Sequence, residues 1–549
     1  MTGNNSSTVA PAMLLVTTNV STQLIMPVDT GSPSTGFILW GAALVFVMLP
    51  GLAMFYSGLS RYNSALSLMV LCMLAGAVVS IQFFLFGFSL AFSETGGAFI
   101  GDFKMGALNT LGAHAFPHTS PQIPSVAFMV YQMQFATITA ALIFGSVPER
   151  TRFVPGMVFV FCWTTLVYDF TAYWSWGDHG WIRNFACLSI AASDHPCYNG
   201  AYDFAGGGPV HIASGFAGLA YCLVLGRRKH VHVEHHSLVN VMLGTGMLWF
   251  GWFAFNGGSA GAANTRAAMA ATVTTISAAA GGLTWIFVDY GFTRKLSALS
   301  FCSGVVAGLV GITPAAGFVA PWAAIVIGFL VSIICNGWVR FKKRLRFDDS
   351  FDAFSVHGCG GFLGNILTGV FAQKWVGRLD GTEIDGGWLE GNWIQVAYQL
   401  GSSAAIAAWS FAISLILLLA INRIPGLHLR QSELDEALGG DFAECGEVGY
   451  MLVISDPGTT TPDDEPHTQT LGVLNDGKRV SVADALKHPF ALASHKSLER
   501  HRSLASPVRE NSGRPNFAFS RQESEMVDLP THEVPSNDKI TANGHRAQL

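Results

Sequence analysis

The sequence predicts an all-α polytopic membrane protein with eleven transmembrane helices. Its 549 residues are 50% hydrophobic and only 12% charged, whereas soluble domains carry about 25% charged residues. Apolar stretches recur along most of the chain, and a bilayer core of about 30 Å needs about 20 such residues per helix. Since lipid offers no hydrogen-bond partner to the backbone, each stretch is expected to be helical.

The expected spans share their length and a near absence of charge. In chain order they are 37–58, 66–92, 124–145, 153–173, 203–226, 236–257, 267–290, 297–313, 321–340, 350–374 and 394–421. Basic residues gather in alternate loops, among them 150–152, 227–229 and 342–346, while the intervening loops hold few. This asymmetry places the N-terminus outside and the C-terminus inside the membrane-bounded compartment.

Segment 1–36 is polar and lacks the basic start of a signal peptide, so we expect a retained extracellular tail before the membrane domain 37–422. Glycosylation acceptor patterns in this tail begin at Asn4, Asn5 and Asn19 and fit an extracellular end. Chance occurrence in a Ser-rich tail is the rival interpretation.

Two segments follow the last span. Residues 423–450 are expected to form a cytoplasmic regulatory segment, and 451–549 a mostly disordered cytoplasmic tail, because the latter has few apolar runs to bury. Within the tail, Ser481 and Ser503 follow basic residues, a pattern that many kinases accept. Such patterns are common in Ser-rich tails, so kinases are only candidate partners.

Two histidines lie inside predicted spans, where ionisable groups are rare and suggest function. His211 follows Asp203 by eight residues near the outer start of its span, and His357 follows Asp349 by eight near the inner start of its own. Eight helical residues cover about 12 Å, so the two side chains reach within about 6 Å of the same depth in a core of about 30 Å. They are therefore expected to approach each other.

The surroundings of the two histidines indicate an inverted repeat. The segments DFAGGGPVHI at 203–212 and DSFDAFSVHG at 349–358 share Asp and Val-His at equal offsets. Two five-helix halves of opposite topology, followed by an eleventh helix, would place a site between the halves. A single histidine in a helix is more often a hydrogen-bonded core residue, but a matched pair offers both a donor and an acceptor.

Other classes of function lack support in the sequence. The net charge of −5 provides no basic patch for nucleic acid, and the nine cysteines form no CxxC or metal-ligand spacing. Neither a nucleophile nor a phosphate-binding loop stands out. We therefore expect no metal, no cofactor and no enzymatic activity. Most of the 60 glycines are interpreted as small residues for close helix packing.

Several long motifs resemble those of the ammonium transporter family (Amt, Mep and Rh proteins), most closely its fungal Mep-type permeases with a twin-histidine pair. DFAGGGPVHI resembles the family's fifth-helix signature, and FDAFSVHGCGGFLGNILTGVF at 351–371 resembles its tenth-helix signature. Similar segments, in the family's order, are FYSGLSRYNS at 55–64, YQMQFATITAALIFGSVPERTRF at 131–153 and GWFAFNGGSA at 251–260. The resemblance covers about 37–450 and implies a homotrimer of pores in the plasma membrane.

The resemblance also implies roles for individual residues. Trp176, Phe135 and Ser259 would form an outer ammonium recruitment site, and Tyr131 and Phe255 a stacked aromatic gate. His211 and His357 would be the twin pore histidines, and Asp203 the vestibule aspartate. Asp203 is expected to act mainly as a helix cap. Because the outer loop before Asp203 is longer than usual, Trp181 is the alternative to Trp176.

The chemistry of these residue types fits ammonium. A bare cation is costly to bury in an apolar pore, whereas neutral ammonia costs far less, and potassium has no proton to give up. We expect deprotonation at the pore mouth, conduction of NH3 and net transport of charge, with methylammonium as an analogue. A histidine at the first pore position, where some fungal permeases carry Glu, is typical of the high-affinity, sensor-type branch.

Two further features lie outside the pore. The stretch at 426–450 resembles the family's regulatory C-terminal segment, and its acidic residues Asp441, Glu444 and Glu447 are expected to pair with the basic loop 342–346 or to remain solvated. Cys187 and Cys197 share a predicted outer loop, so we expect a disulfide there, with two free thiols as the alternative.

Two other functions compete with transport. A receptor would report external ammonium through the long tail and transport little, and sensing could coexist with transport. A gas channel of the Rh type is the other candidate, although that subgroup differs in its tenth-helix and loop motifs.

Overall fold

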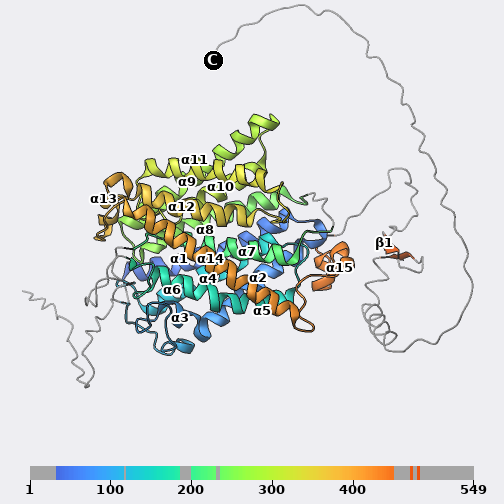
Figure 1. Cartoon of the computed structure of the whole chain (residues 1–549), viewed down its shortest axis with the longest axis horizontal. Coiled ribbons are helices and arrows are strands. Elements are labelled where there is room, and N and C mark those ends of the chain that lie inside the picture. Colours follow the sequence, from blue (N-terminus) through green and yellow to red (C-terminus); the bar gives the residue numbers. More distant parts are fainter. Residues whose placement is uncertain are drawn as a thin grey trace, which may run out of the picture. The chain divides into compact units, whose positions relative to one another are not determined.

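A computed structural model describes residues 32–116, 119–185, 200–229, 235–450, 470–473 and 479–481. The chain separates into two units, Met1–Asp456 and Pro457–Leu549. The first unit is a bundle of long helices packed side by side (Figure 1).

In the part of the chain that the structure describes, the bundle contains eleven helical segments, which we call rods, and several of them change helix type along their length. In chain order they are α1 (Pro33–Leu59); α2 (Ala65–Gln82) with η2 (Phe83–Gly87) and α3 (Phe88–Phe92); α4 (Ser125–Leu142) with η4 (Ile143–Ser146); α5 (Phe153–Trp163) with η5 (Thr164–Tyr168) and α6 (Asp169–Trp176); η7 (Gly207–Ile212) with α7 (Ala213–Leu225); α8 (Leu238–Gly257) with η8 (Gly258–Ala260); α9 (Thr265–Thr293); α10 (Ala298–Ile312); α11 (Pro321–Lys342); η9 (Phe354–Gly358) with α12 (Cys359–Phe371); and α14 (Ile394–Arg423).

Shorter elements lie between and after the rods. They are η1 (Tyr62–Ser64), η3 (Gly106–Leu108), α13 (Lys374–Gly377), η10 (Arg378–Asp380), η11 (Trp388–Glu390), α15 (Glu433–Leu438) and η12 (Asp441–Cys445). In the second unit, β1 (Thr470–Val473) pairs antiparallel with β2 (Arg479–Ser481). This short hairpin lies within the tail 451–549, for which the sequence predicts mostly disordered chain; the long elements of the first unit are all helices, as predicted.

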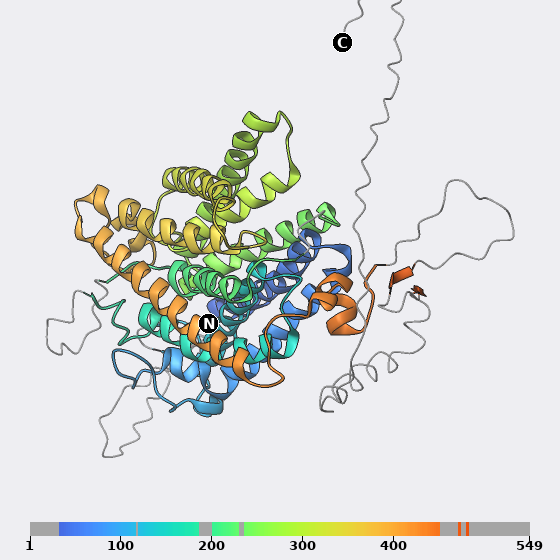
Figure 2. The same ribbon diagram turned by 45° about the vertical axis from the view of Figure 1, so that its right-hand side comes forward.

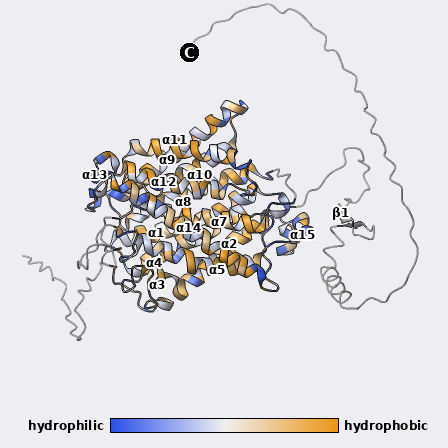
Figure 3. Cartoon of the chain, viewed as in Figure 1, coloured by the Kyte–Doolittle hydropathy of each residue, from blue (hydrophilic) through white to orange (hydrophobic). Residues whose placement is uncertain are grey.

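All eleven predicted apolar segments coincide with rods. Among the described residues, nine rods are long and apolar enough to cross a membrane. The other two predicted segments, 297–313 and 350–374, coincide with α10, which has 15 residues, and with the η9–α12 rod. Figure 3 shows apolar residues along the whole length of the bundle. The chain is therefore a multi-pass membrane protein.

Side-chain caps begin several rods. Ser32, Ser237, Asn264 and Ser297 each accept a hydrogen bond from the backbone N–H three residues later. Such a cap satisfies one of the N–H groups that a helix start leaves unpaired. Pro321 begins α11, where its missing N–H costs nothing.

Small residues allow the rods to pack closely, as the sequence predicts. A Cβ atom on Gly244 of α8 would lie 2.5 Å from the backbone nitrogen of Phe55 in α1. Between α9 and α10, a Cβ atom on Gly281 would lie 2.4 Å from the carbonyl oxygen of Gly304. The last rod, α14, runs diagonally across the bundle (Figure 2) and packs against α5, α7 and α12.

The loops that follow α1, η4, α7 and α11 meet at one end of the bundle. Arg61 and Arg228 both pair with Glu149, and Arg228 also pairs with Asp348. We call this the basic end and the other the far end. The sequence predicts these four loops on one side of the membrane, and the contacts place them together.

Several predictions fall outside the described residues. These are the sequons at Asn4, Asn5 and Asn19, the cysteines Cys187 and Cys197, and the kinase pattern at Ser503. Ser481 lies in β2. Glycosylation, the disulfide, phosphorylation and the domain boundaries stay predictions.

Candidate functional site

The structure brings His211 and His357 into contact at the centre of the bundle. Their Nδ1 atoms are 3.2 Å apart, and the ring centroids are 5.2 Å apart. The side chains are almost fully buried, with 1% of His211 and 5% of His357 exposed. One Nδ1 must donate and the other accept, so a single proton between them links the two rings.

Each histidine sits in a π-helical turn at the start of its rod. His211 lies in η7 and His357 in η9. A π turn adds a residue to the helix and is often found at functional sites. Neither turn was visible in the sequence, because the local pattern of residues is compatible with an ordinary α-helix.

An aspartate caps each of these turns. Asp203 accepts hydrogen bonds from the N–H groups of Gly206, Gly207 and Gly208 at 2.7–2.8 Å. Asp349 accepts from the N–H groups of Phe354 and Ser355, both at 3.2 Å. The equal offsets seen in the sequence therefore correspond to two equivalent helix starts, and the capping role expected of Asp203 is present.

Close backbone contact holds the two turns together. A Cβ atom on Gly215, one turn beyond His211, would lie 2.3 Å from the nitrogen and 2.4 Å from the Cα of Gly358. Beside His211, the ring of Trp252 stacks at 5.5 Å with an interplanar angle of 22°. These contacts fix the position of the histidine pair.

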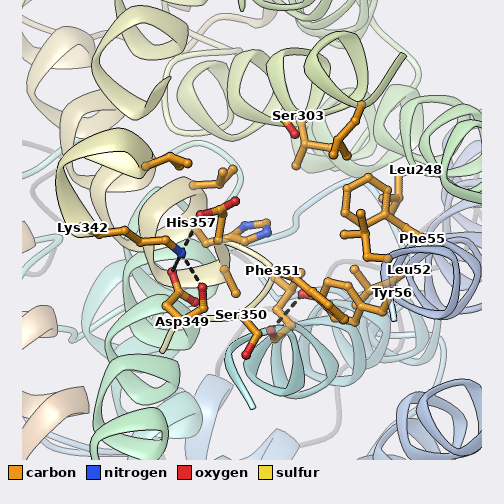
Figure 4. Close-up of a pocket in the computed structure, with 18 of the residues that line it drawn as sticks. Leu52, Phe55, Tyr56, Leu248, Ser303, Lys342, Asp349, Ser350, Phe351 and His357 are labelled. Carbon is orange, nitrogen blue, oxygen red and sulfur yellow. Dashed lines mark hydrogen bonds and ion pairs between the residues drawn. The ribbon is translucent and has the colours of Figure 1, made fainter. Parts of the chain in front are cut away.

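The histidine pair lines a cavity of about 650 Å³ that extends to the basic end. Its apolar walls include Leu52, Phe55, Leu248 and Trp252. Figure 4 shows the imidazole of His357 pointing into this cavity, with the charged side chains of Lys342 and Asp349 beside it. We call it the basic-end cavity.

A second cavity, of about 570 Å³, occupies the far end. It is lined by the predicted recruitment residues Trp176, Phe135 and Ser259, and also by Tyr131 and Asp203. The indole Nε1 of Trp176 donates to the carbonyl oxygen of Asp203 at 3.0 Å. We call it the far-end cavity.

The aromatic pair between the two cavities differs from the one expected. Phe135 stacks on Phe255 with centroids 4.0 Å apart and an angle of 19°, whereas the expected stack was Tyr131 on Phe255. Tyr131 lies one helical turn away on the same face of α4, and its hydroxyl donates to the carbonyl oxygens of Ala254 and Phe255. The predicted stack of Tyr131 on Phe255 is therefore not the one present, and the gate itself stays a prediction. Positions four residues apart share a helix face, and the sequence alone did not distinguish them.

Phe135 lines only the far-end cavity and Phe255 only the basic-end cavity. Their stacked rings thus form part of the partition between the two. Of the two tryptophan candidates, Trp176 faces the partition, since its ring meets Phe135 edge-on at 6.1 Å. Trp181 packs instead against Trp174 and Phe185 and does not line the far-end cavity.

Comparison with known proteins decides the family. The model of the Ammonium Transporter Family matches residues 36–450. The chain belongs to this family. Ammonium transporter 1 of Schizosaccharomyces pombe is 45% identical, with 81% of this chain and 86% of the relative covered. Ammonium transporter MEP2 of Saccharomyces cerevisiae is 43% identical, with coverages of 79% and 85%. The crystal structure of Candida albicans Mep2 matches with a TM-score of 0.68 and 43% identity over 74% of this chain and 87% of that one.

In this member of the Ammonium Transporter Family, the C-terminal segment 426–450 contacts the basic end. Asp441 accepts hydrogen bonds from the N–H groups of Leu66 and Ser67 at the start of α2. Glu444 accepts from the N–H of Phe153 at the start of α5, and burial raises the pKa of Glu444.

The expected pairing of this segment with the loop 342–346 is wrong. Asp441 and Glu444 bind helix starts elsewhere, and Glu447 is exposed without an ion pair to that loop among the described residues. The free N–H groups at the start of a helix carry partial positive charge, so they attract a carboxylate in the same way that a basic side chain would. Charge matching along the sequence could not reveal these backbone partners.

Sequence reasoning also missed the ion pairs beneath the histidines. Arg228 donates to Asp348 at 2.9 Å. Burial raises the pKa of Asp348, but the charges of Arg228 and Arg150 outweigh it and lower the pKa to about 2. The run of charges from Lys342 to Asp349 was the available signal, but it was interpreted only as a basic loop.

Proposed function

We propose that this chain is an ammonium transporter that recruits NH4⁺ in the far-end cavity, removes its proton and conducts NH3 past the histidine pair, with net transport of charge. One observation carries the proposal. Two buried histidines in mutual contact line a cavity whose walls are largely apolar and which a stacked aromatic pair separates from a second, more polar cavity.

The physical argument rests on the cost of burying charge. An isolated cation entering an apolar passage loses hydration worth many kcal/mol, whereas ammonia keeps its neutrality and can exchange hydrogen bonds with imidazole nitrogens. His211 Nε2 is buried and has no hydrogen-bond partner among the described residues. A neutral solute that donates and accepts fits this lining, and potassium does not.

In the proposal, Trp176 and Ser259 receive the cation in the far-end cavity, where Tyr131 supplies an additional aromatic face. Phe135 and Phe255 act as the gate that must part to admit the solute. Asp203 acts through structure, because its carboxylate oxygens bind three backbone N–H groups. Methylammonium, which also carries a removable proton, is the expected analogue.

The proposal includes the membrane topology. Eleven spans, with the N-terminus outside and the basic end in the cytoplasm, agree with the eleven rods and with the positive-inside asymmetry of the loops. We propose a homotrimer in the plasma membrane. Large apolar side chains exposed on α1, α9 and α11, such as Trp40, Phe287 and Phe329, would face lipid or neighbouring subunits.

A sensing role is a second proposal. Its support is the contact of the segment 426–450 with the starts of α2 and α5, because this contact connects the regulatory segment directly to transport helices. Kinases acting on the tail are the proposed partners. Deletion of 455–549 is expected to abolish signalling and leave uptake unchanged, which growth and uptake assays in the same cells can measure.

The proposal of transport is tested by the current across proteoliposomes. A saturable current after an ammonium jump, and none after a potassium jump, is expected for the wild type. His357→Ala should lose this ammonium selectivity, whereas His179→Ala, at an exposed position outside both cavities, should behave as the wild type. A His357→Ala protein with the ammonium current of the wild type and still no potassium current would remove the histidine pair from the mechanism.

A further inference from the structure

A lysine amine occupies the basic-end cavity beneath the histidines. Lys342 Nζ lies 2.5 Å from Asp352 Oδ1 and 3.2 Å from Asp349 Oδ2, and it also donates to the carbonyl oxygen of Asp349. Only 11% of the Lys342 side chain is exposed, and none of that of Asp349. All three residues line the cavity that contains His357 (Figure 4).

The equivalent position at the far end has no such cation. Asp203 and Asp349 cap matching helix starts, yet the described residues give Asp203 no ion pair, and its oxygens bind backbone N–H groups. The two halves of the repeat therefore differ. Among the described residues, the far-end carboxylate binds backbone N–H groups, while the basic-end carboxylate also holds an alkylammonium group.

Asp352 is held in an unusual backbone conformation. Its φ is 61°, in the left-handed region that non-glycine residues rarely adopt. Strain of this kind persists where the surrounding structure enforces it and is often associated with function. Here it accompanies a second carboxylate directed at the Lys342 amine, beyond the one that caps η9.

We propose that Lys342 is a tethered competitor of ammonium at the cytoplasmic exit, where its amine fills a two-carboxylate site that free ammonium would otherwise occupy. This inference rests on the proposed transport function. A lysine amine and ammonium share charge and N–H donors, so the groups that hold one attract the other. With the site filled, NH3 that reaches the exit and takes up a proton there is released into the cytoplasm as ammonium and does not return to block the pore.

Because the Lys342 amine is attached to the chain, it has an advantage over free ammonium in binding the carboxylates of Asp349 and Asp352. A group attached by a short flexible linker acts at an effective concentration of about the millimolar range or above. Free ammonium must exceed this level to displace the Lys342 amine. Without the amine, the buried Asp349 and the partly exposed Asp352 would lie close together without a compensating charge, and they would bind a cation or a proton to avoid that cost.

The test measures inhibition by internal ammonium in voltage-clamped oocytes that express the full chain. Internal ammonium is set by injection, and the inward current evoked by external ammonium is recorded. In Lys342→Gln the apparent inhibition constant for internal ammonium should fall by about tenfold or more, equivalent to about 1.4 kcal/mol. Lys342→Arg, which keeps the charge, should remain close to the wild type. Equal inhibition in Lys342→Gln and the wild type overturns the proposal.

A charge-compensated pair covers the case in which Lys342→Gln does not reach the membrane. Lys342→Gln/Asp352→Asn should be more strongly inhibited by internal ammonium than Asp352→Asn alone, and equal inhibition overturns the proposal. A merely structural ion pair would alter protein yield but not this constant. Absence of any ammonium current in the wild type would instead refute the proposed transport function, so the two failures are distinguishable.

Discussion

Adding one methyl group at Gly215 is expected to separate the two histidines without unfolding the protein. The Cβ atom of an alanine would lie 2.3 Å from the nitrogen of Gly358, whereas nonbonded heavy atoms prefer about 3.5–4.0 Å. The partner is backbone, so no side chain can rotate away. The η9 turn must therefore retreat by about 1 Å.

This retreat reaches the histidines directly, because Gly358 follows His357. The Nδ1–Nδ1 distance of 3.2 Å would increase to about 4 Å, beyond the range of a hydrogen bond. The packing cost is about 1–3 kcal/mol, which is less than a typical stability of about 5–15 kcal/mol. Gly215→Ala should fold but lose at least about tenfold in transport, since displacements of 1 Å can disable a site.

The ammonium-evoked current of proteoliposomes measures the loss, and the melting temperature in detergent shows that the variant is folded. Gly246→Ala is the matched control, because among the described residues no heavy atom beyond the local backbone of α8 lies within 4 Å of the added methyl group. A Gly215→Ala protein with the current of the wild type would refute the argument that backbone contact between the two turns sets the histidine pair.

Three further predictions concern the gate, the basic end and the C-terminal segment. Phe135→Ala removes half of the stack with Phe255, so water and ions should cross between the cavities and a potassium jump should now evoke a current. Asp348→Asn should lower stability by about 2 kcal/mol, since the pKa of Asp348 falls from an unfolded value of about 3.8 to about 2. A carboxyl whose pKa is depressed by folding contributes its full stabilisation above the unfolded pKa and loses it as the pH falls towards 2. The difference in melting temperature between the wild type and Asp348→Asn should therefore be the same at pH 5 and pH 7. Asp441→Ala leaves two N–H groups at the start of α2 without their acceptor, which should lower stability by about 1 kcal/mol. The segment 426–450 should then be cleaved faster by protease, and unchanged cleavage would contradict the docking role of Asp441.

The sequence by itself determined where the rods lie and which two buried histidines come into contact. Both results depend on local rules, because a bilayer sets the length of an apolar helix and a helix rises by a fixed amount per residue. The depth argument for His211 and His357 needed only these rules and the loop charges. The caps at Asp203 and Asp349 were also accessible, since a cap acts on the residues that follow it.

Tertiary structure alone decided contacts between distant segments. Tyr131 and Phe135 share one face of α4, so only the position of α8 determines that Phe135 stacks on Phe255. Asp441 finds its partners in backbone N–H groups 374 residues away, which no charge pattern reveals. The placement of the Lys342 amine between Asp349 and Asp352 depends on how the loop after α11 folds back towards the histidine pair. The sequence specifies the chemistry of each side chain, but long-range packing determines which of several compatible groups that side chain contacts.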